Sequence, residues 1–98
     1  MDVLQVIAEP RRRRILELVW DDELSAGAIA GEFDVTFGAV SQHLAVLKDS
    51  GFVDVRTDGN RRLYRANKQA LGPLRQVLET MWSETLDDLG AAIESDLQ

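Results

Sequence analysis

The residues best suited to chemistry lie in one polar segment near the middle of the chain, residues 36–43. The amide of Gln42 can form two hydrogen bonds to the edge of one base, and Ser41 can reach a base or a phosphate. The segment and its continuation contain no acidic residue until Asp49, which suits a surface that meets phosphates. We interpret it as a contact with duplex DNA, and an ordinary solvated helix surface is the alternative. The candidate DNA contacts here are Thr36, Gly38, Ala39, Ser41, Gln42 and His43.

Arginines supply two further groups of candidate DNA contacts. Residues 11–14 are all arginine and occupy the first turn of an expected helix, where positive charge opposes the helix dipole and a phosphate would offset that cost. Arg11 and Arg12, nearest the helix start, are the expected phosphate ligands; pairing with acids such as Glu17 or Asp21 is the alternative. The second group lies on or beside a tight turn, where it can follow the DNA backbone or enter the minor groove. Its members are Arg56, Asn60, Arg61 and Arg62.

The composition argues against catalysis and against a bound metal. The chain has no cysteine, and His43 is its single histidine, whereas zinc sites combine several cysteine and histidine ligands. We expect His43 to face partly inward, with a DNA contact as the alternative. Asp87 and Asp88 lack a base partner, and no catalytic Ser/His/Asp set or phosphate loop is recognisable. We therefore expect no enzyme activity, no metal site and no cofactor.

The elements that must position these residues are expected in the order helix, helix, helix, helix, hairpin, helix. A short helix is expected over residues 2–8, and Pro10 suits the first position of the second helix. Ser25 and Thr36 are expected N-caps of the third and fourth helices. The fourth helix is expected to run to about Ser50, where Gly51 suits the left-handed position that ends a helix.

The second half of the chain is expected to form a hairpin and one long helix. Residues 52–57 and 61–66 alternate around the turn signal at 58–60, which predicts a β-hairpin. One helix is expected from about Gln69, with Gly72 and Pro73 in its first turn. The fold class is mainly α with a β-hairpin wing, the plan of a winged helix-turn-helix.

Length and charge fit one small DNA-binding domain spanning residues 1–98. The net charge of −6 is unevenly spread: residues 1–70 carry 10 Lys/Arg and 11 Asp/Glu, whereas residues 71–98 carry 1 and 6. We interpret the acidic last third as a solvated helix face. No apolar run approaches the roughly 20 residues of a membrane helix, and no signal peptide is visible. We expect a cytoplasmic protein that is nucleoid-associated when bound to DNA.

The first and last helices are expected to form a homodimer. The apolar stripe of the last helix reaches Ile93 and Leu97, further than one small core requires, so a partner helix is expected to cover it. Folding of the helix back onto its own domain is the alternative. The expected interface residues are Val3, Leu4, Ile7, Leu74, Leu78, Met81, Trp82, Leu86, Leu89 and Ile93.

Four segments carry a resemblance to a known family, and they span nearly the whole chain. They are residues 9–16 (EPRRRRIL), 39–48 (AVSQHLAVLK), 51–53 (GFV) and 59–65 (GNRRLYR). Together they resemble the ArsR-type winged-helix repressors. The resemblance implies a homodimer built from the first and last helices, and repression through a partly palindromic operator.

The chain departs from the family pattern at two helix starts. Glu9-Pro10 stands where members often have Asp-Pro, and residues 36–38 replace the usual Ser and Pro of the recognition helix, so base preference is not predicted. Metal-sensing members use cysteines or His/Asp/Glu clusters, so the chain resembles the cysteine-free, metal-independent branch.

Two other functions fit the same sequence. The acidic balance suits a winged-helix module that binds proteins. A regulator that responds to a small molecule at the dimer interface near Trp82 is the other alternative, although Trp82 is mainly expected to be a packing residue. The operator, the regulated genes and any effector are not predicted.

Overall fold

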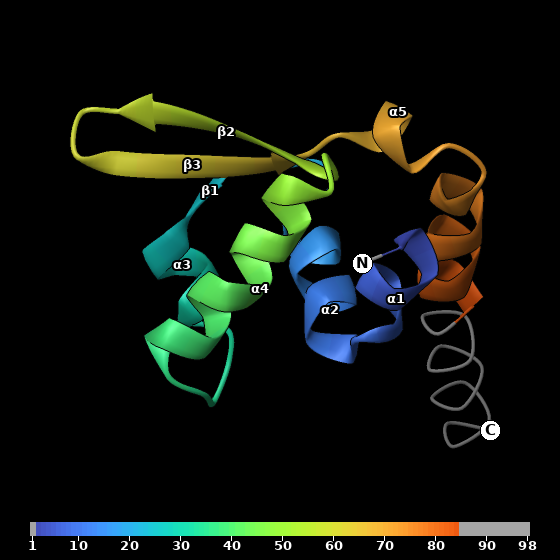
Figure 1. Ribbon diagram of the computed structural model, residues 1–98, viewed down its shortest axis with the longest axis horizontal. Helices are drawn as coiled ribbons and strands as arrows, with labels where there is room; N and C mark the ends of the chain where they lie inside the picture. Colours follow the sequence, from blue (N-terminus) through green and yellow to red (C-terminus); the bar gives the residue numbers. More distant parts are fainter. Residues whose placement is uncertain (1, 85–98) are drawn as a thin grey trace, which may run out of the picture.

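The computed structural model describes residues 2–84 and orders them as helices around a small sheet (Figure 1). The helices are α1 (Val3–Ala8), α2 (Pro10–Leu18), α3 (Ala26–Ala30), α4 (Phe37–Asp49) and α5 (Lys68–Leu71). The strands are β1 (Leu24–Ser25), β2 (Val53–Asp58) and β3 (Arg61–Ala66). Residues 74–84 are also helical. The mainly helical fold with a hairpin confirms the predicted fold class.

Side-chain caps explain where most of these helices begin. The Ser25 Oγ accepts a hydrogen bond from the Ala28 backbone N–H at 3.1 Å, and the Thr36 Oγ1 accepts one from Ala39 at the same distance. These bonds satisfy N–H groups that have no partner within the helix. Both predicted N-caps are confirmed. Asp2 and Gln5 form a reciprocal capping box at the start of α1, a pair that satisfies two such groups at once.

The hairpin forms the wing of the molecule. Asp58 pairs with Arg61, which leaves Gly59 and Asn60 as a two-residue turn with Gly59 at φ +63°. Glycine tolerates this conformation, and such turns match the twist of the strands. A short third strand was not expected: β1 pairs with β3, so the strand order is β1-β3-β2. β1 thereby fixes the start of α3 to the base of the wing.

One apolar core joins the helices to the sheet. α4 contributes its inner face, the strands contribute Val53 and Tyr64, and Phe52 packs against them from the residue before β2. The fully buried side chains are Val6, Ile15, Leu16, Val19, Ile29, Val40, Leu47 and Leu78. Burial of these side chains holds α2, α3 and α4 together because each removes apolar area from water.

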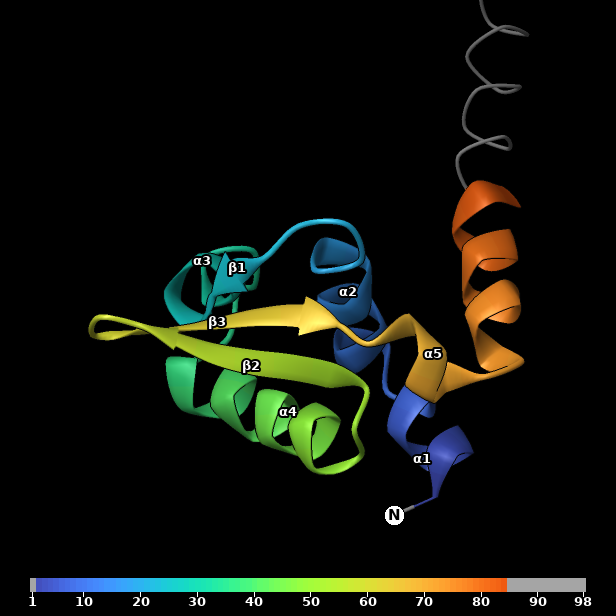
Figure 2. The same ribbon diagram turned by 90° about the horizontal axis from the view of Figure 1, so that it is seen from above.

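The single long helix predicted from about Gln69 is wrong. α5 ends at Leu71, Gly72 takes φ +56° and ψ −131°, and residues 74–84 form a separate helix. Gly72 reaches a backbone conformation that side chains disfavour, and Pro73 offers no N–H to continue α5. The chain therefore turns at Gly72, and Figure 2 shows the new helix leading away from α5 at the end opposite the tip of the wing.

α3 is also shorter than its apolar pattern suggests. It ends at Ala30, with turns over residues 31–35 before α4 begins. Gly31 follows at the C-cap, so Phe33 packs against the core from the turn rather than from the helix. Within residues 2–84, no helix combines the length and the apolar character needed to cross a membrane.

Candidate nucleic-acid interface

α4 presents its polar side to solvent because its other side is buried. Val40, Leu44 and Leu47 face the core, and their spacing of three and four places them on one helical face. Gly38 and Gln42 are exposed, whereas Ala39, Ser41 and His43 are half-buried. Thr36 is exposed, but its hydroxyl oxygen already accepts the capping bond. Gln42 is therefore the longest polar side chain that the first half of α4 offers to a partner.

The tip of the wing and the start of α4 lie at the same end of the molecule (Figure 1). β2 contacts α4, and a pocket of about 360 Å³ lies between the wing and the two helices of the helix-turn-helix. Its lining comes from β1, α3, α4, β3 and the turn of the wing, and consists of Ser25, Ala26, Gly27, Phe37, Asn60, Arg61 and Arg62. The predicted wing residues Asn60, Arg61 and Arg62 are thus brought together with α4.

The three predicted arginines of the wing differ in what they contact. Arg62 is exposed and makes no hydrogen bond or ion pair with any residue from 2 to 84. Arg61 lies 3.8 Å from Asp58 across exposed surface, an ion pair that contributes little. Arg56 donates two hydrogen bonds to Glu23, at 2.8 and 2.7 Å. Of the three, Arg62 is the most available to a phosphate.

The Arg56–Glu23 pair shifts the pKa of both side chains. Hydrogen bonding to Arg56 lowers the pKa of the Glu23 carboxyl, and the same bond raises the pKa of Arg56. The pair joins β2 to the loop before β1. Arg56 therefore has a structural partner that the sequence did not reveal.

The four arginines of α2 also divide by environment. The Arg12 Nε donates to the Val6 carbonyl at 2.6 Å and its Nη2 to the Gln5 carbonyl at 2.9 Å. Arg13 donates to the carbonyls of Ile7 and Ala8 at 2.8 and 3.0 Å. These bonds satisfy carbonyls at the end of α1 that lack helical partners.

Arg11 and Arg14 lie on the outer side of α2. Arg14 pairs with Glu17, as the alternative reading of this segment expected. The Arg11 side chain is exposed and makes no hydrogen bond or ion pair within residues 2–84, although its charge helps to lower the pKa of Glu9. Arg11 remains the predicted phosphate ligand with a free guanidinium, whereas Arg12 holds α1.

His43 is half-buried at the contact between α4 and the start of α2. Burial lowers the pKa of its imidazole; nearby Glu9 acts in the opposite direction, and Arg12 and Arg11 lower the pKa further. The neutral imidazole is therefore favoured near pH 7. Within the described part of the chain, no group of three or more His, Cys, Asp or Glu side chains is arranged to hold a metal ion.

A second surface lies at the end of the molecule opposite the tip of the wing, where α1 and residues 74–84 are found (Figures 1 and 2). Leu4 is 68% exposed and Val77 is 58% exposed, and Val3 is exposed as well. A hollow beside Val77 is lined by Pro73, Gln76, Val77, Thr80, Met81 and Glu84. We call Val3, Leu4 and this hollow the end surface. Val77 was missed by the sequence analysis because it lies one position outside the stripe of Leu74, Leu78 and Met81.

The other predicted interface residues have varied positions. Leu78 is only 1% exposed and belongs to the core of the single chain. The Trp82 ring meets Trp20 edge-to-face, with centroids 4.9 Å apart, and Ile7 and Leu74 also pack against the core. Leu86, Leu89 and Ile93 lie outside the described residues. Trp82 thus ties the last helix to the end of α2.

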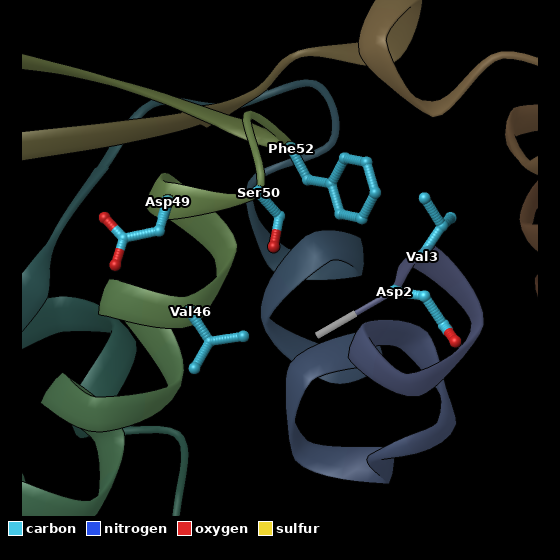
Figure 3. Close-up of a pocket in the computed structure, with 6 residues that line it drawn as sticks. All are labelled: Asp2, Val3, Val46, Asp49, Ser50 and Phe52. Carbon is cyan, nitrogen blue, oxygen red and sulfur yellow. The ribbon is translucent and has the colours of Figure 1, made fainter.

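A third hollow, of about 460 Å³, lies between α1 and the end of α4 (Figure 3). Asp2, Val3, Val46, Asp49, Ser50 and Phe52 line it. The Asp2 carboxylate already accepts the capping bond from Gln5 at 2.9 Å. Because its two charged groups are carboxylates, this hollow is unsuited to a phosphate.

Comparisons with known proteins agree with this geometry. Residues 9–55 match the model of the bacterial regulatory proteins of the arsR family. The chain is 36% identical over 92 residues to an HTH-type transcriptional regulator of Mycobacterium tuberculosis, covering 94% of this chain and 86% of that protein.

Two solved structures are similar over most of their length. The first is the crystal structure of a possible transcriptional regulator for arsenical resistance, with 40% identity and a TM-score of 0.71 over 94% of this chain and 96% of the other. The second is the solution structure of a homodimeric winged helix-turn-helix DNA-binding domain from Mycobacterium bovis. It has 29% identity and a TM-score of 0.69 over 82% of this chain and 74% of the other.

Proposed function

Because this chain belongs to the ArsR family of bacterial regulatory proteins, we propose that it represses transcription by binding a partly palindromic operator as a homodimer. The observation that carries the proposal is the pocket that joins the start of α4 to the arginines of the wing. The function is binding rather than catalysis, and it is exerted in the cytoplasm, where the operator DNA lies.

The proposed complex places α4 in the major groove. That groove is about 12 Å wide and admits an α-helix, and a recognition helix reads bases with the residues near its N-terminus. Gln42 is exposed there, while Gly38 and Ala39 leave room for the edges of the bases. The helix carries no acid before Asp49, so its leading half meets the phosphates without repulsion.

The proposed phosphate contacts are Arg62 on the wing and Arg11 on α2. Both side chains are exposed and make no ion pair within residues 2–84, so their charges are free to displace counterions from DNA. Arg61 adds charge at the same pocket. The wing would lie on the backbone or in the adjacent minor groove.

The proposed dimer uses the end surface, with Leu86, Leu89 and Ile93 as further predicted contacts outside the described residues. Exposed apolar side chains that cluster on one surface commonly mark an interface, and Leu4 and Val77 are two of the most exposed in the described chain. The Mycobacterium bovis relative, of the same fold, is homodimeric. A two-fold dimer would present its recognition helices about 34 Å apart, one turn of DNA.

The test measures, by fluorescence anisotropy, the binding of the purified protein to DNA from its own promoter region at several salt concentrations. Arg62→Ala should reduce the slope of log affinity against log salt by about 0.9 per protomer, for specific and non-specific DNA alike. Gln42→Ala should weaken specific binding about tenfold and leave that slope unchanged, because it removes a base contact.

Two results would contradict the proposal. Affinity that does not depend on salt would exclude the phosphate contacts, and no bound sequence after selection from random duplexes would exclude an operator. A reporter gene under the recovered operator then decides the direction of control, since a repressor lowers its expression.

A further inference from the structure

Phe37 is an aromatic side chain that the fold leaves in solvent. It is the first residue of α4 and is 58% exposed. The start of the helix does not depend on it, because Thr36 supplies the cap, and the core face of α4 begins at Val40. Among the described residues, the other large exposed hydrophobic side chains are Val3, Leu4 and Val77, which all belong to the end surface. Phe37 is therefore unexplained by the core and by the proposed dimer.

The residues around Phe37 indicate which kind of ligand its ring could contact. It lines the same pocket as Asn60, Arg61 and Arg62, and Arg62 has no ion pair within residues 2–84. An apolar ring beside the guanidinium of Arg62, which is unpaired in the described part of the chain, suits a ligand with an anionic part and an apolar part held close together. An acidic protein segment and a nucleotide of duplex DNA both have this character, and the position of Phe37 at the leading end of α4 favours the nucleotide.

Only one base offers an apolar group in the major groove. Thymine presents its 5-methyl group there, whereas cytosine, adenine and guanine present hydrogen-bonding atoms. The thymine methyl lies on the side of the groove nearest the phosphates of its own strand. A ring beside a phosphate-binding arginine is therefore well placed to reach it.

We propose that Phe37 reads a thymine in each half of the operator through its 5-methyl group, beside the phosphate that Arg62 contacts. The inference rests on the proposed DNA-binding function and extends it by naming a specificity-determining residue and its base. It also accounts for an apolar residue at the leading end of a helix whose remaining exposed positions are small or polar.

The experiment replaces the thymines of the selected operator by deoxyuridine, a single thymine in each duplex, and measures affinity by anisotropy. Deoxyuridine keeps base pairing and removes only the methyl group. At one position per half-site, the wild-type protein should bind about fourfold more weakly, the factor that corresponds to one methyl group buried in an apolar contact. Phe37→Ala should bind thymine and deoxyuridine operators equally.

Two matched variants separate this contact from a general loss of binding. Gln42→Ala, on the same helix, should weaken binding yet keep the fourfold response to deoxyuridine. Phe37→Leu should retain most of the response because its side chain is still apolar. Circular dichroism should show that each variant is folded, as expected for substitutions at exposed positions.

The outcomes distinguish the inference from the proposed function. Specific DNA binding without any thymine whose methyl group matters, or with a deoxyuridine response that persists in Phe37→Ala, would overturn the role of Phe37 and leave the regulator intact. Failure to select any DNA would overturn both. If Phe37→Ala binds DNA as the wild type does but no longer binds a protein partner, the Phe37 ring contacts an acidic protein segment instead of a base.

Discussion

His43 connects the folding of the chain to pH through its half-buried imidazole. Burial lowers its pKa in the folded protein, so the unfolded chain takes up a proton near pH 6.5 and the folded chain only at lower pH. The free energy of unfolding should therefore fall as pH drops from about 7.5 to 5.5, and level off below the folded pKa. Urea unfolding at each pH checks this.

The variant His43→Gln serves as the control for that pH dependence. The carboxyls with lowered pKa, Glu9, Asp21 and Glu23, contribute stability that is present above about pH 4.5 and lost below it. Their effect lies outside the window tested. Equal pH dependence in wild type and His43→Gln would contradict the assignment to His43.

Arg11 and Arg12 are adjacent, yet they should respond oppositely to alanine. Arg12→Ala removes the two bonds to the end of α1, so the free energy of unfolding should fall by about 2 kcal/mol, as for hydrogen bonds from a charged donor. Arg11→Ala should leave stability within about 0.5 kcal/mol but weaken DNA binding. Unfolding curves and anisotropy on both variants check this. A stable Arg12→Ala protein would disprove its structural role.

Four consecutive arginines illustrate what a sequence does and does not determine at this scale. Their position at the start of α2 was predictable from Pro10. Which of them turns back to α1 depends on how the end of α1 lies against α2, an arrangement that no local pattern predicts. Arg56 is similar, because its partner Glu23 is 33 residues away and no local pattern identifies it.

At the scale of elements, local signals predicted the starts and ends of helices correctly where a side chain or a glycine acts on its own neighbours. Ser25, Thr36 and Gly51, at φ +82°, are such positions. β1 was missed because two residues carry no periodic pattern, and its existence depends on β3 lying alongside. The break after Leu71 was missed because apolar spacing continues through it, although Gly72 and Pro73 were the available signal.

Gly72 should be the glycine whose replacement disturbs an element most clearly. At φ +56° and ψ −131°, an alanine would be strained, and Gly72→Ala should lower the free energy of unfolding by about 1–3 kcal/mol. Gly27→Ala is the matched control: its new methyl group meets nothing within 4 Å, so this helical substitution should be neutral or stabilising by about 0.5–1 kcal/mol. Chemical denaturation at one protein concentration compares the two, and equal stabilities would contradict the strain.

At the scale of the whole molecule, charge is unevenly distributed along the chain. The last 28 residues hold a net charge of −5, against −1 for residues 1–70. The wing and α2, which carry the exposed arginines, lie in the nearly neutral part of the chain, so the net charge of −6 need not oppose their contact with DNA. The uneven distribution can be seen in the sequence, whereas the end surface is visible only in the fold, where Val77 and Leu4 are exposed at the same end of the molecule.

The proposed dimer predicts that a single buried charge at the end surface should reduce both assembly and DNA binding. Val77→Glu places a carboxylate where an apolar partner surface is expected, and burying an unpaired charge is unfavourable. Sedimentation should show the dimer weakened at least tenfold. Affinity for the full operator should fall toward that for one half-site, because the two recognition helices are no longer linked. Arg75→Glu is the control. It changes the net charge by two units where Val77→Glu changes it by one, but Arg75 lies two positions from Val77 and thus on the opposite side of the helix. It should remain dimeric, and a dimeric Val77→Glu protein would exclude the end surface as the interface.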